Sequence, residues 1–299
     1  EENQGLTLNG YLNLELNNNL NYGEQFLLNY KADGNDQQKL RVKLTLPYLF
    51  KSPFGIETEL NIFRRDSTFL TSNQFLKANY QINPKSKAHL GYTSYQSSNL
   101  RNESITTLFV EDYKSNYLLT GYSFVKNQDN NLFPIKSTLQ INFEIGTKNY
   151  SSVEESQLRA EALFFFIFNL NLKNSILVKN NSKLLSSDTY LTNELYQFGG
   201  INSIRGFSEN SIDASFYSVL NTEYRYQFNN TMYLHSIIDL AYFENQNINL
   251  KEKLYSFGFG IGLKTSPGIL KFSIANGITE NQDFNFSNTK FHISIRSEF

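Results

Sequence analysis

Apolar and polar residues alternate along most of this chain with a period of two. In the segment 5–16, for example, Leu12, Leu14 and Leu16 alternate with polar side chains. Successive side chains of a β-strand point to opposite faces, so this pattern predicts a strand with one apolar face and one wet face. The same pattern predicts strands near 5–16, 20–31, 38–48, 54–66, 72–82, 87–97, 116–125, 135–147, 156–167, 171–185, 215–228, 231–243, 253–265, 269–276 and 289–299.

The polar face of these segments carries charge. Lys39, Arg41 and Lys43 alternate with apolar residues in the segment 38–48. Three cations on one strand face would be destabilising in a protein core, but not beside water. A soluble antiparallel sandwich or sugar-binding barrel is the alternative, but it does not account for a polar second face on nearly every strand. The pattern favours an all-β, transmembrane antiparallel β-barrel with lipid outside and water inside.

The connections between the predicted strands tend to alternate between tight turns and longer loops. The two longest, near 98–115 and 187–212, fall on the same side, which is typical of transmembrane barrels. No linker or helical segment interrupts the series, so we expect one domain over residues 1–299. A bacterial barrel with both termini on the periplasmic side needs an even number of strands. A count of about 15 therefore predicts a first strand upstream of Glu1, in preference to a further strand within 98–115.

Composition narrows the function classes. The chain has 299 residues, a formal net charge of −1 and no cysteine. This charge gives no pull toward nucleic acid, and the lack of cysteine excludes disulfides and thiolate metal sites. The longest apolar run, Ala162 to Phe168, is far shorter than the roughly 20 residues of a membrane-spanning helix. The mean hydropathy of −0.42 fits a barrel, because lumen-facing residues lower the average.

The least ordinary stretch lies in the second long loop and reads Gly199-Gly200-Ile201-Asn202-Ser203-Ile204-Arg205-Gly206-Phe207. Its glycines permit backbone angles closed to other residues and would let the loop lie close against a wall. Arg205 offers five donors in a rigid fork that suits carboxylates. For this stretch alone, a glycine-rich turn with a solvated arginine is the alternative.

Together these stretches resemble the BamA-type outer-membrane assembly and translocation superfamily (BamA/TamA-like, surface-antigen family), whose barrels have 16 strands and usually follow POTRA domains. The family's signature in a loop that folds back into the lumen is matched by Gly199, Gly200, Ile204, Arg205, Gly206 and Phe207, with Ile204 in place of the commoner valine. Shorter resemblances lie at Leu46 to Pro53, at Asp129 to Pro134 and at Ile261 to Gly268.

The resemblance implies partners for Arg205 on the two strands after the loop. Glu223 and Asp239 match the acidic positions, although Ala241 stands where the family has glycine. That both are ordinary solvated lumen residues is the alternative. The last predicted strand is similar to the family's sorting signal, with Phe291, Ile293, Ile295 and Phe299 on one face.

The resemblance implies an outer-membrane assembly or insertion factor of a Gram-negative bacterium, with both termini periplasmic. The seam between its first and last strands would template client strands, and loop 199–207 would latch the barrel. A protein-translocating or solute-conducting porin is the alternative. We expect no enzyme, cofactor or metal site, because His89, His235 and His292 lie on separate predicted strands. Expected partners are outer-membrane lipids, unfolded outer-membrane or secreted client proteins, accessory lipoproteins and upstream POTRA domains, and no nucleic acid.

Overall fold

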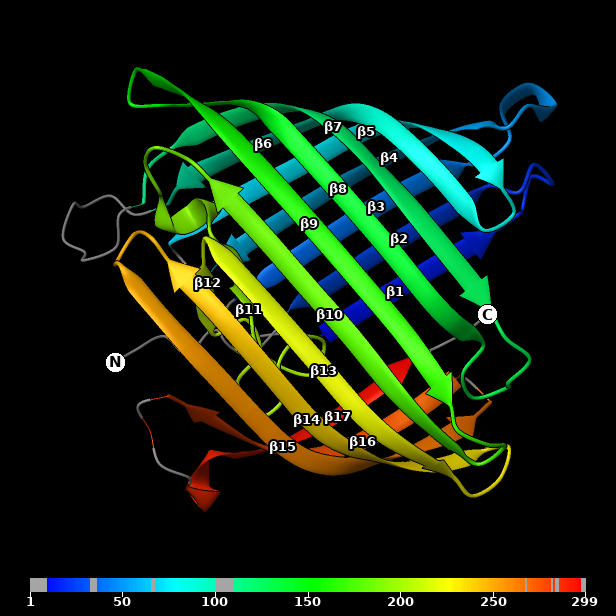
Figure 1. Ribbon diagram of the computed structural model, residues 1–299. Coiled ribbons are helices and arrows are strands. Elements are labelled where there is room, and N and C mark those ends of the chain that lie inside the picture. Colours follow the sequence, from blue (N-terminus) through cyan, green and yellow to red (C-terminus); the bar gives the residue numbers. More distant parts are fainter. Residues whose placement is uncertain are drawn as a thin grey trace, which may run out of the picture. The chain divides into compact units, whose positions relative to one another are not determined.

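The structure is a computed structural model that describes residues 10–32, 37–65, 68–100, 110–266, 268–280, 282 and 285–296. Strands dominate it (Figure 1). They are β1 (Gly10–Asn17), β2 (Gln25–Ala32), β3 (Gln38–Leu46), β4 (Phe54–Arg65), β5 (Phe69–Asn83), β6 (Ser86–Asn99), β7 (Tyr113–Asn127), β8 (Ile135–Tyr150), β9 (Val153–Asn169), β10 (Asn174–Ser186), β11 (Tyr196–Phe198), β12 (Ile212–Ala214), β13 (Phe216–Gln227), β14 (Met232–Asn245), β15 (Leu250–Thr265), β16 (Gly268–Thr279) and β17 (Thr289–Arg296). Three short 3-10 turns accompany them: η1 (Leu49–Lys51), η2 (Thr192–Glu194) and η3 (Phe286–Asn288).

The strand order in the main sheet follows the chain. It runs from β1 to β10 and then from β13 to β17, while β11 and β12 pair as a separate hairpin. Neighbouring strands are antiparallel, for example in the pairs β1–β2 and β13–β14. Among the described residues, no helix is long and apolar enough to cross a membrane.

Two compact units make up the chain. The first comprises Glu1–Tyr122, Asn142–Leu158 and Ser187–Glu194, and the second comprises Ser123–Ile141, Arg159–Ser186 and Leu195–Phe299. The loop between β10 and β13, residues 187–215, therefore passes from the first unit to the second between Glu194 and Leu195. We call this segment the long loop.

In the first unit, the charges predicted on the polar strand face are paired across strands. Arg41 on β3 donates to Glu59 on β4 at 2.8 Å. Glu57, also on β4, lies 3.3 Å from Lys43 on β3 and 3.5 Å from Lys77 on β5. Cross-strand pairs of opposite charge support neighbouring strands. On this polar face, each of these cations therefore lies beside a carboxylate on the neighbouring strand.

In the second unit, β13 and β14 each present one buried face and one exposed face. Glu223 on β13 and Asp239 on β14 are buried, whereas Tyr224 and Ile238 beside them are about half exposed. Alternation of this kind is the expected outcome of a period of two. Apolar residues of the long loop pack on the buried face in one cluster, formed by Phe198, Ile204, Ala214, Tyr217, Val219, Ala241, Phe243 and Leu254.

All fifteen predicted strands correspond to strands of the main sheet, with ends that differ by a few residues. The β11–β12 hairpin was not predicted, because strands of three residues are too short to display a period. The turn after β9 begins at Leu170, slightly beyond the predicted position. Alternation of connection length is weaker than predicted, because the two-residue turn Ser151–Ser152 falls on the side of the long loops. Residues 5–9 and Phe299 lie outside the described residues.

Candidate functional site

Arg205 of the long loop is buried against β13 and β14. Its Nε donates to Oδ2 of Asp239 at 2.8 Å, and its Nη2 donates to Oδ1 of the same carboxylate at 2.6 Å. Its Nη1 donates to Oε1 of Glu223, and its backbone N–H donates to Asp239 at 3.0 Å. One guanidinium thus binds two carboxylates, one of them in bidentate fashion. Charge-assisted contacts of this kind are the strongest hydrogen bonds in proteins.

A second arginine completes the group. Arg225 on β13 donates to Oε2 of Glu223 through Nε at 2.8 Å, and its guanidinium lies 4.5 Å from the ring centroid of Phe133. Two guanidinium groups therefore face two carboxylates, and the formal charges cancel. The side chains of all four charged residues are at most 7% exposed. This cancellation of charge stabilises the group, because a buried charge without a partner is strongly destabilising.

The protonation state of Arg205 follows from these contacts. Burial alone lowers the pKa of a guanidinium, but the hydrogen bonds to Asp239 and the charge of Glu223 outweigh burial and raise the pKa of Arg205. Arg205 is therefore a fixed cation at every pH at which the protein folds.

The backbone after Arg205 explains the glycine at position 206. Gly206 has φ +84°, and a Cβ added there would lie 2.6 Å from the backbone nitrogen of Gly277 on β16. Its N–H donates to Nε2 of His292 on β17 at 3.1 Å. Only glycine combines this backbone conformation with so close an approach. The arginine contacts β13 and β14, and the next residue contacts β16 and β17.

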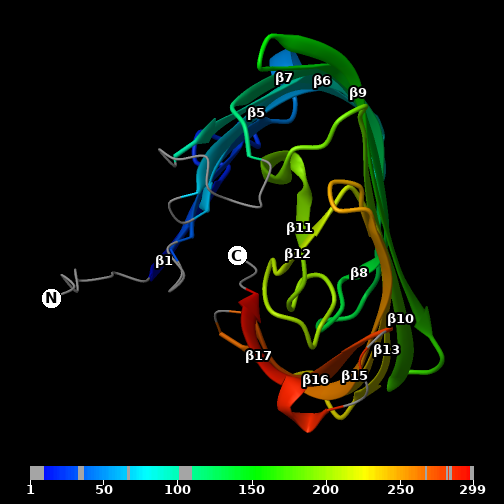
Figure 2. The ribbon, with the colours of Figure 1, turned by 90° about the vertical axis from the view of Figure 1, so that its left-hand side faces the viewer.

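The β11–β12 hairpin encloses the Arg205 segment (Figure 2). Figure 2 shows it on the concave face of the strands β13 to β16. Phe198 stacks on Tyr217 with 4.6 Å between ring centroids and meets Phe243 edge to face at 5.6 Å. Ile204, next to Arg205, is fully buried. Apolar packing and the ion pairs therefore hold the same segment in place.

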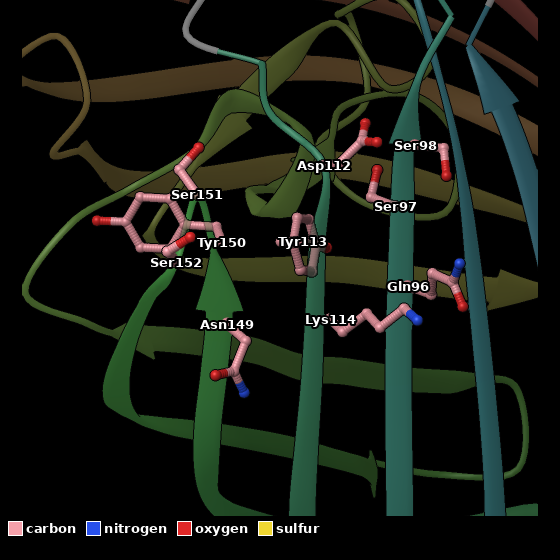
Figure 3. Close-up of a pocket in the computed structure, with 10 residues that line it drawn as sticks. All are labelled: Gln96, Ser97, Ser98, Asp112, Tyr113, Lys114, Asn149, Tyr150, Ser151 and Ser152. Atoms are coloured by element: carbon pink, nitrogen blue, oxygen red, sulfur yellow. The ribbon is translucent and has the colours of Figure 1, made fainter.

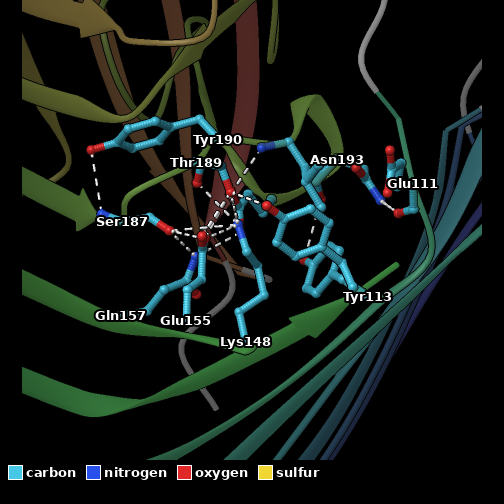
Figure 4. Close-up of polar contacts among 12 residues, drawn as sticks. Glu111, Tyr113, Lys148, Glu155, Gln157, Ser187, Thr189, Tyr190 and Asn193 are labelled. Atoms are coloured by element: carbon cyan, nitrogen blue, oxygen red, sulfur yellow. Dashed lines mark hydrogen bonds and ion pairs between the residues drawn. The ribbon is translucent and has the colours of Figure 1, made fainter. Parts of the chain in front are cut away.

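A second buried polar cluster lies in the first unit, and no pattern in the sequence indicates it. Its centre is Lys148 on β8, whose ammonium contacts Glu155 on β9 at 2.7 Å and Glu194 in η2 at 2.9 Å (Figure 4). Glu194 belongs to the long loop. From the sequence, a lysine at such a strand position is expected to be solvated. Its loop partner, the carboxylate of Glu194, lies 46 residues away in the sequence.

A pocket of about 290 Å³ adjoins this cluster (Figure 3). Ten residues line it, namely Gln96, Ser97, Ser98, Asp112, Tyr113, Lys114, Asn149, Tyr150, Ser151 and Ser152. Three of them also contact the long loop, since Ser97 and Tyr113 hydrogen bond to Asn193 and Tyr150 to Thr189. Lining residues of the pocket therefore also hold the segment that Lys148 contacts. No group of three or more His, Asp or Glu among the described residues is placed to bind a metal ion.

Comparison with known proteins identifies the family. The Omp85 superfamily domain matches residues 13–299, which is almost the whole chain. The chain belongs to the Omp85 superfamily. The resemblance seen in the sequence is thus confirmed at the level of the family. A comparison with curated protein sequences finds no match.

Solved structures share the fold of this Omp85 chain. It is similar to BamA from Haemophilus ducreyi, in a crystal structure that lacks POTRA domains 1–3, with a TM-score of 0.68 and 16% identity over 94% of this chain and 65% of that one. It is also similar to CdiB from Acinetobacter baumannii, with a TM-score of 0.61 and 14% identity over 96% of this chain and 56% of that one. For CdiB from Escherichia coli the TM-score is 0.65, at 12% identity over 95% of this chain and 58% of that one.

The chain thus spans between 56% and 65% of the length of these structures. Like these structures, the chain has the fold of an antiparallel β-barrel, as the alternation of apolar and polar residues predicted. Membership in the Omp85 superfamily places the chain in the outer membrane of a Gram-negative bacterium.

The predicted site residues fall into two groups. The structure brings Arg205, Glu223 and Asp239 into direct contact, whereas their role as a latch stays a prediction. On β17, Phe291 and Ile293 are 75% and 68% exposed, as an outward apolar face requires. The side chain of Ile295 and all of Phe299 lie outside the described residues. The sorting role of this strand also stays a prediction.

Proposed function

We propose that this Omp85 chain inserts or translocates proteins in the outer membrane and that Arg205 is the latch of its long loop. The single observation that carries the latch is the burial of Arg205 between two carboxylates on adjacent strands. An arginine that only lined a solute pore would gain nothing from three side-chain contacts in a charge-balanced group. Family membership and the likeness to BamA support the wider role.

The latch acts on the wall of the barrel. Arg205 joins β13 to β14 through Glu223 and Asp239, and Gly206 joins the loop to β17 through His292. The loop thereby fixes the spacing of strands close to the end of the sheet order. Such contacts stabilise one arrangement of the wall against others, and no chemical step is involved. We accordingly propose that the chain is not an enzyme.

Clients are proposed to be recognised through backbone pairing. β1 and β17 are the terminal strands of the sheet order. The edge of a terminal strand offers N–H and C=O groups that an incoming β-strand can pair with, whatever its side chains. We propose that a seam at these edges templates strands of unfolded outer-membrane or secreted proteins. Accessory lipoproteins and preceding POTRA domains are proposed partners, and both chain ends are proposed to be periplasmic.

Arg205→Ala tests the proposal against the porin alternative. Cells that depend on this protein should lose assembled outer-membrane or secreted clients, and the purified variant in planar bilayers should keep the ion selectivity of the wild type. Lys179→Ala is the matched control, because Lys179 also contacts the same loop, donating to the carbonyl of Asn202 at 3.1 Å in an exposed hydrogen bond. If Arg205→Ala raised conductance while client levels stayed normal, the chain would be a porin.

A further inference from the structure

Lys148 is buried completely, and its partners account for the burial. Its side chain is 0% exposed, and its ammonium contacts the carboxylates of Glu155 and Glu194. The same ammonium donates to the carbonyl of Thr189 at 3.0 Å. A buried ammonium ion is tolerated only when its hydrogen bonds and charge are satisfied. Two of these three partners, Thr189 and Glu194, belong to the long loop.

Glu194 joins the first part of the long loop to β8 and β9. Besides Lys148 it accepts a hydrogen bond from Nε2 of Gln157 on β9 at 2.9 Å. It also accepts the backbone N–H of Leu191 at 2.9 Å, and its own N–H donates to the carbonyl of Leu191 at 3.2 Å. Gln157 in turn accepts from the hydroxyl of Tyr117 on β7. One carboxylate thus closes the η2 turn and ties it to β8 and β9.

Asn193 adds a neutral contact to the other side of the same turn. Its Nδ2 donates to Oγ of Ser97 on β6 and to the carbonyl of Glu111, both at 2.8 Å. The hydroxyl of Tyr113 on β7 donates to its carbonyl at 3.4 Å. Figure 4 shows these contacts around the same segment as those of Lys148. First-unit residues on four strands, β6 to β9, therefore hold residues 187–194.

The cluster around Lys148 and the group around Arg205 are separate. The described contacts of the one share no residue with those of the other. Residues 187–194 belong to the first unit, whereas Leu195 and the rest of the long loop belong to the second. Nothing in the geometry of the Lys148 cluster uses the Arg205 ion pairs. Each group satisfies its own buried charges locally.

We infer that Lys148, Glu155 and Gln157 are positioning residues that hold residues 187–194 of the long loop as a second anchor, released independently of Arg205. The inference rests on the proposed function only in assigning this loop a role in client handling. The consequence is a loop with two points of attachment, of which the one at residues 187–194 stays in place when the Arg205 group opens. Breaking the latch then frees the tip of the loop but not its first eight residues.

Amide hydrogen exchange of the whole chain in lipid vesicles tests the inference, with two backbone groups as reporters. The N–H of Leu191 binds Glu194, and the N–H of Gly206 binds His292. Lys148→Met should speed exchange at Leu191 by at least tenfold and leave Gly206 as in the wild type. Arg205→Ala should do the reverse. Asn193→Ala should also speed exchange at Leu191. It leaves no buried charge unpaired, so it replaces Lys148→Met as the test variant if Lys148→Met does not fold.

Lys253→Met is the control, because Lys253 forms an ion pair with Glu280 in which both side chains are about half exposed. It should change neither reporter. The inference is overturned if Lys148→Met and Asn193→Ala leave Leu191 protected, or if either variant frees both reporters together. Client assembly in cells carrying Arg205→Ala tests the proposed function separately, so one can fail while the other stands.

Discussion

Asp239→Asn is the sharpest single test of the buried ion pairs. The substitution keeps the size of the side chain but replaces one oxygen by an NH₂ group. Asp239 accepts Nε, Nη2 and the backbone N–H of Arg205. In the variant, a donor would face a donor at one of these positions. Two guanidinium charges would also share the single carboxylate of Glu223.

The expected cost follows from that imbalance. Removing one partner of a buried ion pair typically costs about 3–5 kcal/mol, because the other charge is left uncompensated. Here the side chain of Asp239 is 0% exposed, so water cannot replace the lost contact. We therefore expect a loss of about 3–5 kcal/mol in the free energy of unfolding, which raises the unfolded fraction by a factor of roughly 100 or more.

Denaturant unfolding in detergent micelles measures this loss. The chain has no tryptophan, so far-UV circular dichroism of the strands is the natural signal. Glu280→Gln is the matched control, since it breaks the exposed pair with Lys253 and should cost less than about 1 kcal/mol. Arg205→Met combined with Asp239→Asn should cost less than the sum of the single changes, because the two residues interact. If Asp239→Asn were no more costly than Glu280→Gln, the group would not hold the loop.

Three further predictions follow from single positions. Gly206→Ala should detach the tip of the loop, seen as faster proteolysis between β11 and β12, because its Cβ would lie 2.6 Å from the backbone of β16 and φ is +84°; wild-type proteolysis would refute the close approach. Phe259→Lys, half-way along the exposed face of β15, should cost about 2–4 kcal/mol when unfolding is measured in lipid vesicles, whereas Phe286→Lys in η3 should be nearly neutral in the same vesicles. The pKa of Glu24 is lowered below 4.5 by the backbone N–H of Leu20, so its stabilisation of the β1–β2 turn is present above that pH and is lost as the pH falls through the folded pKa. Hydrogen exchange in that turn should rise on acidification in the wild type but be independent of pH in this range in Glu24→Gln.

Much of the fold can be predicted from the sequence, because a strand between lipid and water must alternate apolar and polar side chains. Apolar side chains must point outward and polar ones inward, so the position of each strand and the face of each side chain can be predicted from consecutive residues. This is why His292 and Phe291, neighbours in sequence, could be assigned to opposite faces of β17. His292 indeed contacts Gly206 of the loop, and Phe291 is exposed.

The acidic contacts of Arg205 could be predicted for a different reason. Glu223 and Asp239 share the inward parity of their strands, but parity also admits Asn221 and His235. The resemblance to a family motif selected the two carboxylates from this set. Periodicity alone would have left Arg205 without defined partners. The structure adds Arg225, which balances the charge of the group.

The sequence by itself determined the strands, the face on which each strand side chain lies and the loop that carries Arg205, because the two-residue period and the loop motif are both properties of consecutive residues. Only the tertiary structure decided how the long loop is fastened. The β11–β12 hairpin is too short to show a period, and Lys148 meets Glu194 only because the loop returns to β8 and β9. A buried lysine and a solvated one look alike in a sequence, since burial is a property of what packs against the side chain.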